Sequence, residues 1–443
     1  MSKIFKSLFK LSNIQLLLLI MLLSIAIRTY SEYSYIHEMY KIKTVVWVDD
    51  WDYINYSKAI FNGIFLHTQF ITQESEYYRI DEIPPLYPMI LSIFYGIVGY
   101  SHLHWIFLLN IFVTLINIYL LYLIASFLYK GKLTLLPAFL WSIYINSLIH
   151  TARVLKEPFI TLFILLIVYM LCRLLLKFKY RDVGILAMLC AMFSHLDERY
   201  LFMSALSLLF VIVILIKQKS KSYIGKAVFL YILISLVLYT PWMIRNYLRY
   251  DKIVLITLRT SIITDKIFGY DNSENAIVDL TTNVTAEKVD SIIAGHTLST
   301  VDIVTQKNIV HAGKLGIKPY HYNLTERLLY NTMSFWQLFS LRPFMIGSGY
   351  KVNFYWGIKS NIIVIFEFSI FFILSLYAFY QGIRKRQSIL IFMFCILLLN
   401  TMQHAYLGAG LTRYRSVMDP LIYLAAGYTI YQFISRKQLR KTD

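Results

Sequence analysis

About ten apolar runs constrain this chain more than any other feature of its sequence. They cover residues 11–28, 104–129, 133–149, 158–176, 183–194, 200–216, 227–243, 361–382, 388–404 and 416–435. A helix needs about 20 apolar residues to cross the roughly 30 Å hydrocarbon core of a bilayer, and most of these runs are close to that length. Only 15% of the 443 residues are charged, against about 25% in a typical soluble domain. The sequence therefore predicts an all-α polytopic membrane protein with about ten transmembrane helices.

The first apolar run follows a short basic start, MSKIFKSLFK. This order is also typical of a signal peptide, but no small-residue cleavage site of the A-x-A type follows the run. We therefore expect residues 1–28 to form a retained first transmembrane anchor. The aromatic run 85–100 is expected to be a surface helix on the outer face.

Positive charge gathers in the pieces that this topology places in the cytoplasm, which are residues 1–10, 130–132, 177–182, 217–226, 384–386 and 436–443. Their only acids are Asp182 and Asp443, so they carry nearly all of the net charge of +18. This agrees with the positive-inside rule, which a full span at 85–100 would break. We expect an inner (cytoplasmic) membrane protein with both termini in the cytoplasm. Short basic clusters at helix ends suit anionic membrane lipids and do not predict nucleic-acid binding.

The predicted spans divide the chain into five parts. They are the anchor 1–28, an outer loop 29–103 with an acidic motif and surface helices, transmembrane helices 2–7 over 104–243, an outer-face loop region 244–360, and helices 8–10 with a basic cytoplasmic tail over 361–443. The outer region 244–360 includes the amphipathic stretch NLTERLLYNTMSFWQLF, which suits the membrane interface. Cys172, Cys190 and Cys395 all lie in predicted spans, so no disulfide is expected in the outer loops.

The stretch WVDDWDYINYSKAIFNG in the first outer loop places Asp49, Asp50 and Asp52 within four positions. Carboxylates before a helix accept hydrogen bonds from its free N–H groups and suit its dipole, which accounts for one or two of the acids. A third acid at the membrane surface exceeds what capping requires. Neighbouring carboxylates raise one another's pKa, which suits a general base. Capping and catalysis both stay open at this point.

Two further outer turns contain acids. In HTARVLKEPFITLF, Glu157 precedes Pro158, an order that is typical of a helix start, and Arg153 is a candidate partner for Glu157. Because the outer ends of different spans meet in space, Glu157 can face the acids of the first loop. The other turn, SHLDERY, is expected to be solvated; its polar residues are His195, Asp197, Glu198 and Arg199.

Five motifs in chain order carry a family resemblance. They are DDWDYINYSKAIFNG, IPPLYPMILSIFYGIVG, ARVLKEPF, YTPWMIRNYLRYDKIVLIT and GAGLTRYRSVMDPLIYLAAGY. Together they resemble the GT-C glycosyltransferases, in the branch of the protein O-mannosyltransferases and the lipid A aminoarabinose transferases. The resemblance implies the GT-C fold. It also implies transfer of a sugar from a polyprenyl-phosphate carrier to a glycan, lipid or protein acceptor on the outer, periplasmic face.

The resemblance also implies roles for particular residues. Asp49 matches the leading acid of the family, Asp50 its partner and Glu157 the second acid. We expect Asp49 to be the general base and Asp50 to position the acceptor, with a divalent cation held by Asp50 and Glu157 left open. The leaving phosphate needs positive charge, ideally the bidentate fork of arginine. Three arginines at outer helix ends are candidates for donor binding, with Arg413 favoured over its neighbour: Arg245, Arg413 and Arg415.

Two departures from the family pattern leave the sugar and the acceptor open. Pro84 occupies the position where aminoarabinose transferases have lysine, and the chain lacks the large soluble insertion of eukaryotic protein O-mannosyltransferases. Two other functions remain as alternatives. One is a polysaccharide polymerase or ligase that acts on a lipid-diphosphate-linked glycan. The other is a lipid-linked sugar flippase, which is expected to place charged residues along its spans rather than at their outer mouths.

Overall fold

The computed structural model describes residues 10–42, 48–63, 83–99, 104–218, 221–250, 253–257, 358–407 and 412–439, together with Thr332 and Trp336. Within these ranges every regular element is a helix. Five helical segments among the described residues are long and apolar enough to cross a membrane: Asn13–Tyr33, Trp105–Leu128, Glu157–Leu176, Glu198–Lys217 and Ile224–Leu248. Large apolar side chains such as Leu22 and Phe229 point outward from them, as expected of helices that face lipid. The protein is thus a helical membrane protein.

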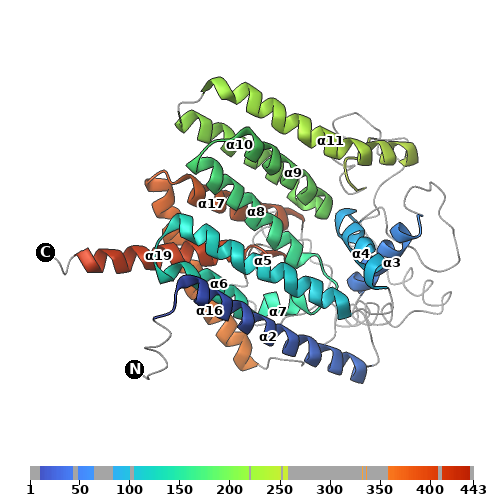
Figure 1. Ribbon diagram of the computed structural model, residues 1–443, viewed down its shortest axis with the longest axis horizontal. Coiled ribbons are helices and arrows are strands. Elements are labelled where there is room, and N and C mark those ends of the chain that lie inside the picture. The colour runs from blue at the N-terminus through green and yellow to red at the C-terminus, as the bar shows by residue number, and fades with distance from the viewer. Residues whose placement is uncertain are drawn as a thin grey trace, which may run out of the picture.

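The bundle is made of long helices that lie side by side, with short 3-10 turns between some of them (Figure 1). In chain order the helices are α2 (Asn13–Ile42), α3 (Val48–Phe61), α4 (Leu86–Val98), α5 (His104–Leu128), η3 (Lys132–Leu135), α6 (Leu136–Ile143), α7 (Ile145–Thr151), α8 (Glu157–Leu176), α9 (Tyr180–Leu196), η4 (Glu198–Tyr200), α10 (Phe202–Lys217), η5 (Lys221–Tyr223), α11 (Ile224–Tyr250), α16 (Ile358–Arg384), α17 (Ser388–Leu407), α18 (Thr412–Ser416) and α19 (Asp419–Leu439). Helix α8 packs between α5 and α9, and α16 packs on α19. The start of α2 and the end of α19 lie at one end of the bundle, opposite α3 and α4 (Figure 1).

Several helices run past the apolar stretches that predicted them. Helix α2 continues to Ile42, beyond the predicted end of the anchor at residue 28. Helix α11 continues to Tyr250 with Pro241 inside it, although the predicted span ends at residue 243. A helix can continue past the edge of the hydrocarbon, because the interface accepts its polar side chains. The apolar runs therefore locate the helices but not their ends.

The predicted span 133–149 is wrong as a single helix. It is divided into η3, α6 and α7, and Tyr144 between α6 and α7 has extended backbone angles (φ −66°, ψ 122°). The apolar pattern gives no sign of this break, because both halves are apolar and neither glycine nor proline stands at the junction. Backbone groups that a break releases inside a membrane need partners within the protein.

The short helices α3 and α4 lie at the end of the bundle where α8 begins. Helix α4 corresponds to the predicted surface helix, and its Tyr87 is fully buried. The Tyr87 ring meets Tyr53 of α3 edge-on at 4.9 Å and lies 5.7 Å from Phe159 of α8, both between ring centroids. These aromatic contacts fix α3, and with it the acidic motif, over the first turn of α8.

Candidate functional site

The acidic motif forms the first turns of a helix rather than preceding one. Helix α3 begins at Val48, so Asp49 and Asp50 belong to its first turn. The side chains of these two acids lie outside the described residues, and their catalytic role stays a prediction. One turn further on, Tyr53 is buried, and the Nζ atom of Lys156 lies 6.0 Å from the centroid of its ring. The structure thus brings the helix of the acidic motif beside the KEP motif.

Glu157 begins α8, with Pro158 in the first turn, as the sequence predicts. The Glu157 side chain is buried, which sets it apart from an ordinary solvated helix start. The neighbouring turn is fixed by α5, where Asn110 Nδ2 donates to the backbone carbonyls of Thr151 (3.3 Å) and Arg153 (2.7 Å). The second predicted acid is therefore held inside the protein at the mouth of α8.

The expectation that the SHLDERY turn is solvated is wrong. Asp197 is completely buried and forms ion pairs with Lys156 (Nζ–Oδ2, 3.0 Å) and Arg199 (Nη2–Oδ2, 2.5 Å). Arg199 also donates from Nε to Asp197 Oδ1 at 2.8 Å, which makes the contact bidentate. The Arg199 backbone N–H donates to the same oxygen at 3.1 Å and starts η4. We call Lys156, Asp197 and Arg199 the ion triad.

The ion triad keeps its charges over a wide pH range. Burial by itself would raise the pKa of Asp197, but Arg199 and Lys156 more than offset it and hold that pKa well below its usual range. Burial would likewise lower the pKa of Lys156, yet Asp197 raises it above its ordinary value. A general base needs a pKa near the working pH. Asp197 is therefore a fixed anion that positions two cations and not a candidate base.

The late RYR motif reaches the ion triad through its tyrosine. Tyr414 of α18 lies under the guanidinium of Arg199, with 4.0 Å between its ring centroid and the Cζ atom. His404, near the end of α17, also contacts Tyr414: the two rings stack with 4.8 Å between their centroids. The side chain of Arg413, the favoured phosphate ligand, lies outside the described residues. Sequence reasoning missed Tyr414, although it stands between the two arginines that were singled out.

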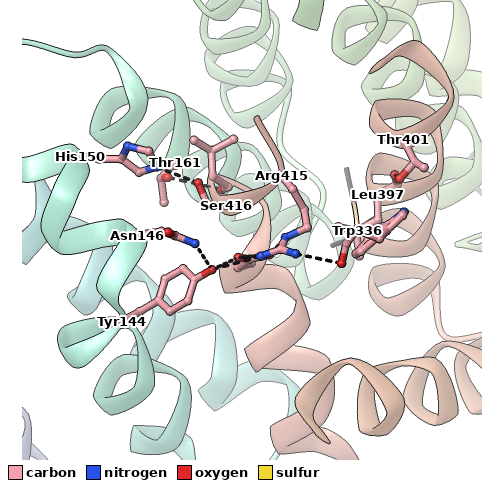
Figure 2. Close-up of polar contacts among 11 residues, drawn as sticks. Tyr144, Asn146, His150, Thr161, Trp336, Leu397, Thr401, Arg415 and Ser416 are labelled. Atoms are coloured by element: carbon pink, nitrogen blue, oxygen red, sulfur yellow. Dashed lines mark hydrogen bonds and ion pairs between the residues drawn. The ribbon is translucent and has the colours of Figure 1, made fainter. Parts of the chain in front are cut away.

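Arg415 points into the protein. Its side chain is buried and forms an ion pair with Asp419 one turn later (Nε–Oδ1, 3.2 Å). It also donates to the hydroxyl of Tyr144 at 3.4 Å and to the backbone carbonyl of Trp336 at 3.3 Å (Figure 2). The guanidinium carbon lies 3.8 Å from the ring centroid of Phe368. These contacts direct the Arg415 guanidinium to partners inside the protein, and its role as a donor ligand stays a prediction.

Arg245 belongs to the part of α11 that extends past Pro241. The C-terminal end of α11 lies at the same end of the bundle as α3 and α4 (Figure 1). Its guanidinium carbon lies 4.9 Å from the centroid of the Trp242 ring, and Nη1 donates to Asn246 Oδ1 at 2.8 Å. Asn246 in turn donates to the carbonyls of Val254 and Ile256, which folds residues 253–257 back against the helix. Arg245 thus lies beside a hydrogen-bonded turn, and its role toward a phosphate stays a prediction.

Metal ligands do not gather among the described residues, where no group of three or more His, Cys, Asp or Glu side chains has the geometry to hold an ion. The side chain of Asp50 lies outside the described residues, so the divalent cation stays an open option. The cysteines are free thiols: Cys172 and Cys190 are buried and Cys395 is half-buried.

No family model matches the chain, and no curated protein matches it. The resemblance to GT-C glycosyltransferases therefore rests on the five motifs alone.

Proposed function

We propose that the protein is an integral-membrane glycosyltransferase that moves a sugar from a polyprenyl-phosphate carrier to an acceptor on the outer face of the membrane. The observation that carries this proposal is the convergence of four stretches that are far apart in the sequence: the acidic motif DDWDY, the KEP motif, the SHLDERY turn and the RYR motif. Their meeting point is the ion triad, which contacts Tyr53 of the acidic motif and Tyr414 of the RYR motif. Polar motifs that gather at one end of a helical bundle are typical of an active site built on its loops.

The arrangement suits a displacement at the anomeric carbon of the donor sugar. The bond from that carbon to the phosphate oxygen breaks as the acceptor oxygen forms its own bond to the carbon. The acceptor proton passes to Asp49, and the carrier phosphate leaves with the electron pair of the broken bond. Asp50 orients the acceptor, and the leaving anion is stabilised by Arg245 and Arg413, because unpaired charge at the membrane boundary is costly.

The acidic motif offers a matched pair of variants to test this function. Asp49→Asn keeps the size and capping capacity of the side chain but removes its charge, so transfer should fall by about two to four orders of magnitude. Asp52→Asn, the same change three positions later, should leave transfer close to wild type. Lipid-linked sugars that accumulate without the gene identify the donor, and transfer from that donor is then measured with the purified protein. Full activity of a well-folded Asp49→Asn variant would refute the assignment.

The phosphate ligands have a separate test. Arg245→Lys and Arg413→Lys keep the positive charge but lose the planar fork that binds two phosphate oxygens. Each variant should raise the donor KM or lower turnover while the protein stays folded and inserted. Unchanged donor affinity and full turnover in both variants would show that these arginines only anchor the helix ends.

A further inference from the structure

Arg28 is a buried cation near the middle of α2 and is not part of the motifs discussed so far. It is among the largest fully buried side chains of the described residues. A guanidinium has five N–H donors, and each of the five has an acceptor here. The acceptors are Thr151 Oγ1 (3.3 Å), Ser24 Oγ (2.6 Å), the carbonyl of Ser142 (2.7 Å), the carbonyl of Trp141 (3.4 Å) and Ser147 Oγ (2.6 Å).

Ser24 belongs to α2, and the other four acceptors lie on the two sides of the break at Tyr144. The carbonyls of Trp141 and Ser142 belong to the last turn of α6, where carbonyl groups have no partner within the helix. Ser147 and Thr151 are one turn apart on α7. A single side chain from α2 therefore donates to two of the carbonyls that the break leaves without a helical partner, and it also binds two hydroxyls of α7.

The break in turn places the side chain of Tyr144. Its hydroxyl donates to Asp419 Oδ2 and accepts from Asn146 Nδ2 at 2.6 Å and from Arg415 Nη2 at 3.4 Å. Figure 2 shows this hydroxyl at the centre of the group, between α7 and the α18–α19 segment. In an unbroken helix the residue at position 144 would follow the helical path, and its hydroxyl would lose this junction.

A second contact ties α7 to the same segment. His150 Nε2 and Ser416 Oγ form a hydrogen bond of 2.7 Å, and Thr161 of α8 donates to the carbonyl of Val417 at 3.4 Å. Residues 415–419 are thus held from α7 and α8, directly after Tyr414, which packs on Arg199 of the ion triad.

We propose that Arg28 is a positioning residue: by holding the α6–α7 break open, it sets Tyr144 and so places the RYR motif against the ion triad. The catalytic part of this inference rests on the proposed glycosyltransferase function, whereas the structural coupling does not. An ionisable residue within a span often marks a ligand or ion path. Arg28 does not fit that role, because its five donors are all used by neutral acceptors of the protein.

Hydrogen–deuterium exchange tests the coupling without any assay of activity. Arg28→Lys keeps the charge but cannot reach five acceptors. Amide exchange should therefore become roughly tenfold faster in peptides covering 139–151 and 412–419. This is the size expected when one hydrogen bond to a charged group is lost. Tyr144→Phe keeps the break but removes the hydroxyl, so only 412–419 should respond. Arg173→Lys on α8, whose Nη2 contacts Asp182 at 3.2 Å, is the control and should change neither peptide.

Kinetics then separates positioning from general damage. A purely structural defect lowers the amount of active enzyme and leaves KM unchanged, whereas misplacement of the RYR motif should raise the donor KM of Arg28→Lys by roughly tenfold. Ser147→Ala removes one acceptor of Arg28, so it should change the exchange rates and the donor KM in the same direction but by a smaller amount. This variant replaces Arg28→Lys in the test if Arg28→Lys fails to fold. Unchanged exchange in 412–419, faster exchange throughout the bundle, or an unchanged donor KM in an active protein would each overturn the inference. If exchange in 139–151 and 412–419 responds as expected but the wild-type protein has no transfer activity, the structural coupling stands and the proposed function is refuted.

Discussion

The ion triad gives the sharpest prediction about stability. Asp197→Asn keeps the shape of the side chain but leaves two cations without the carboxylate that they share. Breaking a buried ion pair by removing one partner costs about 3–5 kcal/mol. The Arg199 side chain is 17% exposed and the Lys156 side chain only 7%. Because water still reaches Arg199, we expect a loss near the lower limit, about 3 kcal/mol.

The matched control is Asp182→Asn at the start of α9. That carboxylate is also buried, with 2% of its side chain exposed, but its partners Arg173 (3.2 Å) and Arg181 (3.7 Å) retain 33% and 69% exposure. Water screens such pairs, and the loss should be no more than about 1 kcal/mol. Both variants are compared by equilibrium unfolding in detergent micelles. Equal losses in the two variants, or a loss below about 1 kcal/mol for Asp197→Asn, would refute the reasoning from burial.

The pH dependence of this loss has a defined sign. Because the folded pKa of Asp197 lies below its unfolded value of about 3.9, its stabilisation is complete above that value and is lost as pH falls toward the folded pKa. The folded pKa of Lys156 is raised, so its contribution is complete below about 10.4 and is lost as pH rises further. The contribution of these two charges to the stability of the wild type should therefore be flat between about pH 5 and 9. A steep change near neutral pH would contradict the assigned charges.

Three further predictions concern topology, donor binding and packing. Single cysteines at Lys132 and Ser75, in a background without the native cysteines, should react with impermeant reagents from opposite sides of the membrane; labelling from one side would overturn the predicted topology. Arg245→Ala should weaken donor binding more than Arg245→Lys, measured as donor KM, because the alanine variant loses the charge as well as the fork. Gly427→Ala should lower the free energy of unfolding by about 1–3 kcal/mol, since its Cβ would collide with the hydroxyl of Tyr129. The control Gly225→Ala meets nothing within 4 Å and should cause no loss. Equal losses in the two variants would contradict this packing.

The sequence by itself determined the class of protein and the position of most helices. Apolar runs near 20 residues long leave a membrane helix as the main way to satisfy the backbone, and that reading needs no tertiary contact. The start of α8 at Glu157 was predictable in the same way, because proline and a carboxylate suit a helix N-terminus locally. The motifs that now surround the ion triad were also visible, as clusters of charge at the ends of apolar runs.

The tertiary structure decided what those clusters do. The sequence around Asp197 is typical of a solvated turn. Its burial becomes favourable because Lys156, 41 positions earlier in the preceding outer turn, joins the local partner Arg199 in pairing with the carboxylate. The break at Tyr144 was equally hidden, because the groups that stabilise it come from Arg28 in α2 and from Asp419 in α19. The local sequence sets which backbone conformations of a segment are low in free energy. Contacts between segments far apart in the chain decide whether a buried charge or an interrupted helix finds its partners, and no local pattern encodes those contacts.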